Sequence, residues 1–344
     1  MASLDPVWSL VQSSQFRVKM LKISSVLGVS NDRRLREALQ KDDADIARLF
    51  KSVVSSDVHK KAVLRLKGGS AQNCVDLIQD VLDKGSFQGT EDDKFTLKAR
   101  RLLVKLSEVS DTLPSSLFIQ GVARLDKEAT FGGTFGDIYR CSYQGQDVAL
   151  KRIRVFQRDA ARKIRKVARP ITFLGGHLLI AYAQRFCREA LLWQRLHNPY
   201  VLPFTGIDAE SFPSFLCMVS PWMRHGTILK HLQENGNANV ERRLFEIAQG
   251  LAYLHSQDII HGDLRGSNIL VDDDWHACLA DFGLAVFSDA TVATQTSHHG
   301  GSVRWMSPEL HYPQSCGLDT FKRTFASDVY SFAFVCIEVR VHSG

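Results

Sequence analysis

The chain has 344 residues, of which 44% are hydrophobic and 23% charged, the proportions of a globular protein with room for two domains. Its longest apolar stretch, Pro170 to Ala183, is too short and too interrupted by glycine to span a bilayer, and we expect no secretory signal. The seven cysteines include no CxxC pair, which argues against a zinc site or a disulfide framework. We therefore expect reduced thiols in the cytosol or the nucleus.

The net charge of +6 is unevenly distributed: residues 1–122 contribute +4, and one short segment has the largest excess of basic residues. Residues 152–186 hold nine basic residues and one acidic residue, whereas residues 187–344 hold eleven basic and seventeen acidic residues. A nucleic-acid-binding domain usually spreads its basic surface over the binding face. The charge distribution therefore does not predict a nucleic-acid partner.

Residues 1–116 predict an all-α region. Apolar residues recur at helical spacing over 35–53, and a second helix is expected with Ser70 as its N-cap and Gly85 as its stop. A third helix is expected from about Asp92 to Val109. No catalytic constellation occurs here, so we predict a helical bundle that packs against the rest of the chain or binds a protein partner.

From Leu117 onward, short β-type runs replace the helical pattern, and helices return later. The expected elements are strands at 138–142 and 148–153 around a turn at Gln144–Gln146, a helix near 188–196, strands near 201–206 and 215–219, and a helix at 240–255. Strands followed by helices, without β-α-β alternation, indicate an α+β fold in two lobes.

A glycine-rich segment lies between the first two of these strands. Gly132, Gly133 and Gly136 would let the backbone approach a ligand closely and point amide groups at phosphate oxygens, although glycines also serve ordinary hairpins. Lys151 ends the apolar run that begins at Val148. It could hold phosphates as a point charge, or it could be a solvent-exposed strand lysine.

The most specific signal is the run from His261 to Asn268, followed by Asp281-Phe282-Gly283. Phosphoryl transfer needs a carboxylate that accepts the hydroxyl proton and oxygen ligands for Mg²⁺. Asp263 would supply the carboxylate, and Asn268 and Asp281 would supply the ligands. Apolar residues at 269–271 and 278–280 predict a hairpin between these two groups.

Together with Gly301–Glu309 and Ser327–Phe332, these motifs resemble the tyrosine-kinase-like protein kinases over about residues 121–338. The sequence motifs His-Gly-Asp-Leu-Arg-Gly at 261–266 and Ser-Pro-Trp at 220–222 resemble those of the expanded kinase sets of mushroom-forming fungi. The resemblance implies a two-lobed protein-kinase-like fold, α+β in class, over 117–344. Its parts would be an N-lobe at 117–219, a hinge at 220–226 and an incomplete C-lobe at 227–344.

The resemblance also implies ATP and Mg²⁺ as cofactors and assigns roles to residues. Lys151 would contact the α- and β-phosphates and pair with Glu189, Asp263 would be the catalytic base, and Asn268 and Asp281 would hold the metal. Asp328 would hydrogen-bond back to the catalytic loop. The residues expected to line the nucleotide are Gly132, Gly133, Gly136, Ile138, Ala149, Lys151, Ser220 (as gatekeeper), Trp222 and Met223.

Several positions depart from the family pattern. Phe131 stands where the first glycine of the loop is usual, which makes the entry to that loop less flexible. Gly262 replaces the arginine that normally receives an activation-loop phosphate, so we do not expect the usual phosphorylation switch. The segment 284–302 has no tyrosine but contains phosphorylatable residues: Ser288, Thr291, Thr294, Thr296 and Ser297.

We thus predict an ATP-dependent protein kinase that transfers the γ-phosphoryl group to a protein hydroxyl. Trp305–Glu309 favours serine or threonine as acceptor, whereas Arg265 also occurs in some tyrosine kinases. The alternative is an inactive, nucleotide-binding scaffold that acts through its N-terminal helices. No sequence feature names the substrate.

Two segments raise questions about the gene product. Residues 167–184 are apolar and lengthen the connection between Lys151 and Glu189, and we hypothesise that they are translated intron. As an insert, they would be expected to displace Glu189 from Lys151. The apolar run 333–337 has no following helices to cover it, so we expect the polypeptide as written to aggregate and to lack substantial kinase activity.

Overall fold

The computed structural model describes residues 5–29, 32–85, 90–126, 128–132, 136–153, 176–212, 215–236, 239–288 and 302–342. Gly133, residues 167–175 of the hypothesised intron, and the candidate phosphorylation sites Thr291, Thr294, Thr296 and Ser297 lie outside these ranges. The chain divides into two compact units, 1–118 with 157–188 and 119–156 with 189–344.

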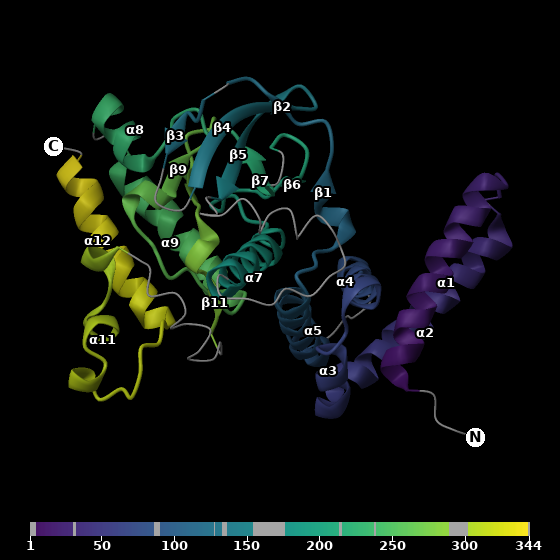
Figure 1. Cartoon of the computed structure of the whole chain (residues 1–344). Coiled ribbons are helices and arrows are strands. Elements are labelled where there is room, and N and C mark those ends of the chain that lie inside the picture. Colours follow the sequence, from purple (N-terminus) through teal and green to yellow (C-terminus); the bar gives the residue numbers. More distant parts are fainter. Residues whose placement is uncertain are drawn as a thin grey trace. The chain divides into compact units, whose positions relative to one another are not determined.

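The first unit is helical, as predicted for the N-terminal region. Its helices are α1 (Pro6–Val26), α2 (Arg33–Ser55), α3 (Asp57–Val63), α4 (Gly68–Asp83) and α5 (Thr90–Ser110), followed by the 3₁₀ turn η1 (Ser115–Leu117). Helices α1 and α2 lie side by side (Figure 1). Helix α2 buries Ile46, Phe50 and Val53, which share one face because their spacing follows the helical repeat.

The expected N-cap of the second predicted helix is wrong. Helix α4 begins at Gly68, and its N-cap is Lys67, the last residue with extended backbone angles. Ser70 therefore lies inside the first turn, where its backbone is already helical. The predicted stop is confirmed, because Gly85 has a φ of +57° and its amide donates to the Leu82 carbonyl.

Helix α7 (Gly176–Trp193) belongs to the first unit up to Arg188. The Arg188 Nε donates to the Glu108 Oε1 of α5 over 2.6 Å, and both side chains are mostly buried. Residues 176–184, the part of the hypothesised intron that the structure describes, form the first half of α7. The helix near 188–196 was thus predicted, but its early start was not.

The sheet of the second unit consists of β1 (Phe118–Ile119), β2 (Ala123–Arg124), β3 (Phe131–Gly132), β4 (Gly136–Tyr143), β5 (Gln146–Ile153), β6 (Gly206–Asp208) and β7 (Cys217–Pro221). The strand order is β1-β6-β7-β5-β4-β2, and β3 pairs with β4. The turn at Gln144-Gly145 is confirmed, since both residues have the positive φ of a two-residue hairpin. The strand expected near 201–206 starts only at Gly206, and Val201 forms an isolated bridge with Leu279.

Alternation along the two long strands decides which side chains face the core. Tyr139 and Cys141 of β4, with Val148 and Leu150 of β5, are buried in one apolar cluster. Because successive strand residues point to opposite faces, Lys151 lies on the other face of the sheet. This alternation directs the lysine away from the apolar cluster.

The remainder of the second unit is mainly helical. Its elements are α8 (Ile228–Asn235), α9 (Val240–Ser256), β8 (Ile259–Ile260), η2 (Gly266–Asn268), β9 (Ile269–Val271), β10 (Ala277–Leu279), η3 (Phe282–Leu284), β11 (Val286–Phe287), η4 (Val303–Trp305), α11 (Pro308–His311), η5 (Gln314–Cys316) and α12 (Phe325–His342). The predicted hairpin is present as the antiparallel pair β9–β10, and β8 pairs with β11.

The apolar side chains of α12 are divided between two faces. Within the run 333–337, Val335 is fully buried whereas Ile337 is more than half exposed, and on the rest of the helix Val339 is buried whereas Val329 and Val341 are exposed. Among the described residues, no helix has the length and hydropathy needed to cross a membrane.

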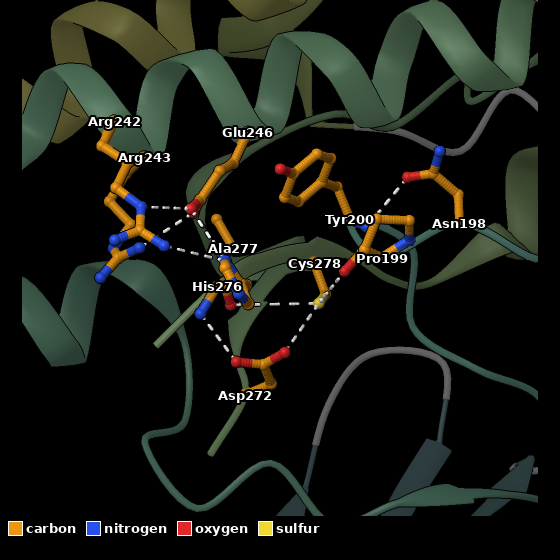
Figure 2. A network of polar contacts seen from close by, with 10 residues as sticks. All are labelled: Asn198, Pro199, Tyr200, Arg242, Arg243, Glu246, Asp272, His276, Ala277 and Cys278. Atoms are coloured by element: carbon orange, nitrogen blue, oxygen red, sulfur yellow. Dashed lines mark hydrogen bonds and ion pairs between the residues drawn. The ribbon is translucent and has the colours of Figure 1, made fainter. Parts of the chain in front are cut away.

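A buried carboxylate fixes the β9–β10 hairpin to α9 (Figure 2). Glu246 accepts hydrogen bonds from the Ala277 amide at 2.9 Å and Arg243 Nη1 at 2.9 Å, and it contacts His276 Nδ1 at 3.0 Å. Arg242, which precedes Arg243 on α9, forms a further ion pair with Glu246 at 2.9 Å. Burial alone would raise the pKa of Glu246, but the Ala277 amide, His276 and Arg243 outweigh burial and hold the pKa below its usual range.

We predict that Glu246→Gln lowers the melting temperature by roughly 5 °C or more at pH 7, because it leaves the buried Arg243 without its counterion. A lowered folded-state pKa stabilises the fold above the usual carboxyl range and loses that effect as the pH falls through the folded pKa. The difference from wild type should therefore shrink at acidic pH. Differential scanning calorimetry from pH 7 down to pH 2.5 measures it, with the exposed Asp274→Asn as control, and an undiminished difference at pH 2.5 contradicts this prediction.

Candidate active site

The loop that carries Asp263 is held by a buried carboxylate at the start of α12. Asp328 accepts the His261 amide on Oδ2 at 2.8 Å and the Gly262 amide on Oδ1 at 2.9 Å. Its Oδ2 also lies 3.0 Å from Nε2 of His255 on α9. The expected hydrogen bond from Asp328 back to this loop is confirmed.

Asp263 itself is oriented through both carboxylate oxygens. Asn268 Nδ2 donates to the Asp263 carbonyl at 2.8 Å and to its Oδ2 at 3.2 Å. The Ser302 amide donates to Oδ1 at 3.1 Å. The structure thus brings together Asp263 and Asn268, which the sequence placed in one short loop.

A second group forms around Lys151. Its ammonium donates to Glu189 Oε1 at 2.7 Å and to Asp281 Oδ1 at 2.8 Å. Burial disfavours the charged ammonium, but the carboxylates of Asp281 and Glu189 outweigh burial and raise the pKa of Lys151. The expectation that residues 167–184 displace Glu189 from Lys151 is wrong, because α7 extends backward through 176–184 and leaves Glu189 in reach.

The backbone connects the two groups. The Ala280 amide donates to the Asn268 carbonyl at 2.9 Å, one residue before Asp281. Asp281 has a φ of +63°, an unfavourable conformation for a residue other than glycine, and such strain is often found at functional sites. Phe282 fixes this turn by packing its ring 5.5 Å from His261 and 5.8 Å from Trp193.

The register of the sheet places other predicted residues beside Lys151. Ile138 pairs with Lys151, and Ala149 pairs with Ser220, so these side chains share the lysine face of the sheet. The remaining predicted nucleotide-lining residues in the described chain are at the edges of this face: Gly132 in β3, Gly136 at the start of β4, and Trp222 and Met223 directly after β7.

The profile of the protein tyrosine and serine/threonine kinase family matches residues 127–343. The chain belongs to this family. Among curated proteins, it is 29% identical over 234 residues to the serine/threonine-protein kinase TNNI3K of Mus musculus, and 29% identical over 221 residues to the serine/threonine-protein kinase CTR1 of Arabidopsis thaliana. The serine/threonine/tyrosine-protein kinase HT1 of Arabidopsis thaliana is 28% identical over 214 residues.

Each alignment covers only part of this chain and part of the relative. They include 66%, 62% and 60% of this chain for TNNI3K, CTR1 and HT1, in that order. They span 25%, 23% and 47% of those three proteins. The kinase domain therefore accounts for the similarity, and the chain is a phosphotransferase by family.

An aromatic contact that the sequence did not indicate joins Trp222, directly after β7, to Phe131 of β3. The rings of Phe131 and Trp222 stack with centroids 6.1 Å apart and an interplanar angle of 22°. Phe131 pairs with Ile138 across β3 and β4, so its ring lies on the same face of the sheet as Lys151. The signal available in the sequence was the replacement of a loop glycine by an aromatic residue.

Polar contacts also connect the loop that carries Asp263 to the C-terminal segments of the described chain. Arg265 donates to the Ser302 hydroxyl, and its guanidinium lies 5.2 Å from the centre of the Trp305 ring. Glu338 of α12 accepts the Gly266 amide at 2.9 Å and Trp305 Nε1 at 3.0 Å. Sequence reasoning noted Arg265 but missed Ser302 and Glu338, because their partners lie more than 30 residues away.

The oxygen atoms of Asn268 and Asp281 suit a hard cation such as Mg²⁺, which takes its other ligands from water and phosphate. No group of three or more His, Cys, Asp or Glu side chains in the described residues could hold a metal alone. Asn268 and Asp281 offer two oxygen donors, which matches the way Mg²⁺ binds through one or two protein groups, water and phosphate. The residues present therefore fit the divalent metal and ATP that protein kinases generally use.

We predict that Glu189→Gln lowers kcat about tenfold or more, because Lys151 loses one of its two anionic partners and its ammonium is less firmly placed. The variant keeps the size of the side chain, so folding should be preserved. A filter-binding assay of γ-phosphoryl transfer measures the change, with the exposed Glu241→Gln as control. Equal kcat in wild type and Glu189→Gln would show that the pair does not matter for turnover.

Proposed function

We propose that this chain transfers the γ-phosphoryl group of Mg-ATP to a protein hydroxyl, with serine or threonine preferred over tyrosine. The hydrogen-bonded arrangement of Asp263 with Asn268, and of Lys151 with Asp281, carries this proposal. In a transfer with so little covalent chemistry, positioning and charge stabilisation provide most of the rate enhancement.

Asp263 is the proposed general base. Its carboxylate would accept the proton of the substrate hydroxyl and align the oxygen for attack. Contacts with Asn268 and the Ser302 amide already fix its orientation. Little reorganisation of the carboxylate would then be required when the substrate binds.

Lys151 is the proposed phosphate ligand, and Glu189 is its positioning partner. The buried ammonium is compensated by two carboxylates, so it stays charged and can contact the α- and β-phosphates. Gly132, Gly133 and Gly136 would provide backbone amides to the phosphates. Residues of the lysine face and the hinge would contact the base: Ile138, Ala149, Ser220, Trp222 and Met223.

Asn268 and Asp281 are the proposed metal ligands. When bound, Mg²⁺ would neutralise charge on the transferring phosphate and hold it in line. Asp281 Oδ1 accepts a hydrogen bond from the Lys151 ammonium at 2.8 Å, which places this carboxylate beside the proposed phosphate ligand.

Acceptor preference is inferred from the relatives. TNNI3K and CTR1 are named serine/threonine-protein kinases, and HT1 is named a serine/threonine/tyrosine-protein kinase. We therefore propose a tyrosine-kinase-like type with serine or threonine as the main acceptor. The similarity to fungal kinase sets stays a prediction from the amino-acid sequences of residues 261–266 and 220–222.

We further propose that 1–116 and 117–344 act as two functional parts, the first binding a protein partner. The matched range 127–343 supports the division.

A location in the cytosol or nucleus is proposed because all seven cysteines are unpaired in the described residues. The origin of residues 167–184 as intron remains a hypothesis that sequencing of the spliced message tests.

We predict that Asp263→Asn lowers γ-phosphoryl transfer by about a hundredfold or more while Mg-ATP affinity stays close to wild type, because Asp263 orients the hydroxyl rather than the nucleotide. Asp281→Asn should lower both transfer and Mg²⁺-dependent nucleotide binding. Transfer from labelled ATP and isothermal titration with Mg-ATP measure the two effects. Full transfer activity in Asp263→Asn would refute the assigned role, and nucleotide binding with no transfer in wild type would favour the scaffold.

A further inference from the structure

Arg323 is the bulkiest fully buried side chain in the described part of the chain, with 1% of its surface exposed. It lies between η5 and α12. Burying a guanidinium is costly unless it makes specific polar contacts, so such a residue is rarely retained for packing alone. Neither the motifs nor the family match draws attention to this position.

The side chain of Arg323 reaches the residue directly before the proposed base. Its Nε donates to the Gly262 carbonyl at 3.2 Å. Its guanidinium lies 4.9 Å from the centre of the Phe321 ring, a cation–π distance that helps fix its plane. The arginine thus contacts the peptide that joins Gly262 to Asp263.

The space that Arg323 fills exists because position 262 is glycine. A Cβ at Gly262 would lie 2.8 Å from Cδ of Arg323 and 2.8 Å from the Leu284 carbonyl oxygen, and the φ of Gly262 is +78°. The family pattern has an arginine at 262. In this chain the cation next to the catalytic loop comes instead from position 323.

Residues 323–328 therefore hold the catalytic loop on both sides of Gly262. Asp328 accepts the Gly262 amide, and Arg323 donates to the Gly262 carbonyl. Glycine has more backbone freedom than any other residue, so without these contacts the peptide before Asp263 could rotate. With the Gly262 amide bound to Asp328 and the Gly262 carbonyl bound to Arg323, both backbone polar groups of the glycine are fixed, and so is the direction in which the Asp263 side chain leaves the backbone.

We propose that Arg323 is a positioning residue for Asp263, which it holds from a segment outside the catalytic loop through the Gly262 carbonyl. This inference rests on the proposed function. It assigns to Arg323 an effect on turnover, transmitted through the Gly262 carbonyl, and no contact with nucleotide.

The test compares Arg323→Met and Arg323→Lys with wild type in the full chain. Methionine keeps much of the apolar stem but removes the donor and the charge, whereas lysine keeps the charge but lacks the planar Nε donor. We expect kcat to fall roughly tenfold to a hundredfold in Arg323→Met and by a smaller factor in Arg323→Lys. The KM for ATP and the Kd of Mg-ATP should stay within about twofold of wild type, because the nucleotide contacts are unaltered.

The matched control is Lys322→Met, which removes a positive charge from the neighbouring, exposed residue. It should leave kcat unchanged, which separates the contact with Gly262 from a general effect of charge. Assays are run at least 15 °C below the melting temperature of each variant, about the margin at which the folded form dominates. If Arg323→Met shows no cooperative melt, Arg323→Lys decides alone.

Wild-type kcat in Arg323→Met, or in Arg323→Lys when the methionine variant does not fold, overturns the inference. A parallel fall in kcat and in Mg-ATP affinity also overturns it, since that result indicates general disruption of the fold. Asp263→Asn distinguishes this failure from failure of the proposed function. If that variant is inactive while Arg323→Met is normal, only the role of Arg323 is wrong. If the wild-type chain shows no transfer that depends on Asp263, the proposed function and this inference both fail.

Discussion

The candidate active site depends above all on one buried ion cluster, in which the Lys151 ammonium donates to Glu189 and Asp281. These residues come from a strand, a helix and a loop that are far apart in the sequence. The two carboxylates offset the cost of burying the lysine, so the cluster holds together Lys151 of β5, Glu189 and the turn after β10. Strand alternation contributes by directing Lys151 away from the apolar cluster of the sheet.

A second set of contacts positions the chemistry itself. Asp328 holds the amides of the loop before Asp263, Asn268 orients Asp263, and the Ala280 amide ties Asn268 to the segment that carries Asp281. The proposed base and the proposed metal ligands are thus connected by backbone hydrogen bonds as well as by side chains. Glu246 supports the same hairpin from its far end through the Ala277 amide. Rigid support of this kind is what positional catalysis requires.

Sequence reasoning succeeded where chemistry is encoded at short spacing. Asp263, Asn268 and Asp281 lie within 19 positions of one another, and the hairpin between them follows from its apolar runs. The pairing of Lys151 with Glu189 was inferred only through the family resemblance, because spacing alone does not indicate a contact over 38 residues. The expected N-cap at Ser70 was wrong because helix α4 already begins at Gly68, with Lys67 as its N-cap, although serine is the more favourable capping residue.

The contacts that could not be predicted are those in which an unusual residue meets a distant one. Phe131 was recognised as a departure from the glycine pattern, but its stacking on Trp222 depends on the twist and register of the sheet. Gly262 was recognised in the same way, and the arginine that fills the adjoining space lies 61 positions later.

The most direct test of the proposed phosphoryl transfer is a crystal structure with Mn²⁺ and a non-hydrolysable ATP analogue, measured at the manganese absorption edge. Anomalous density about 2.1 Å from the Asn268 and Asp281 oxygens, with the phosphates on Lys151, is the expected result, whereas manganese or nucleotide bound elsewhere would contradict it.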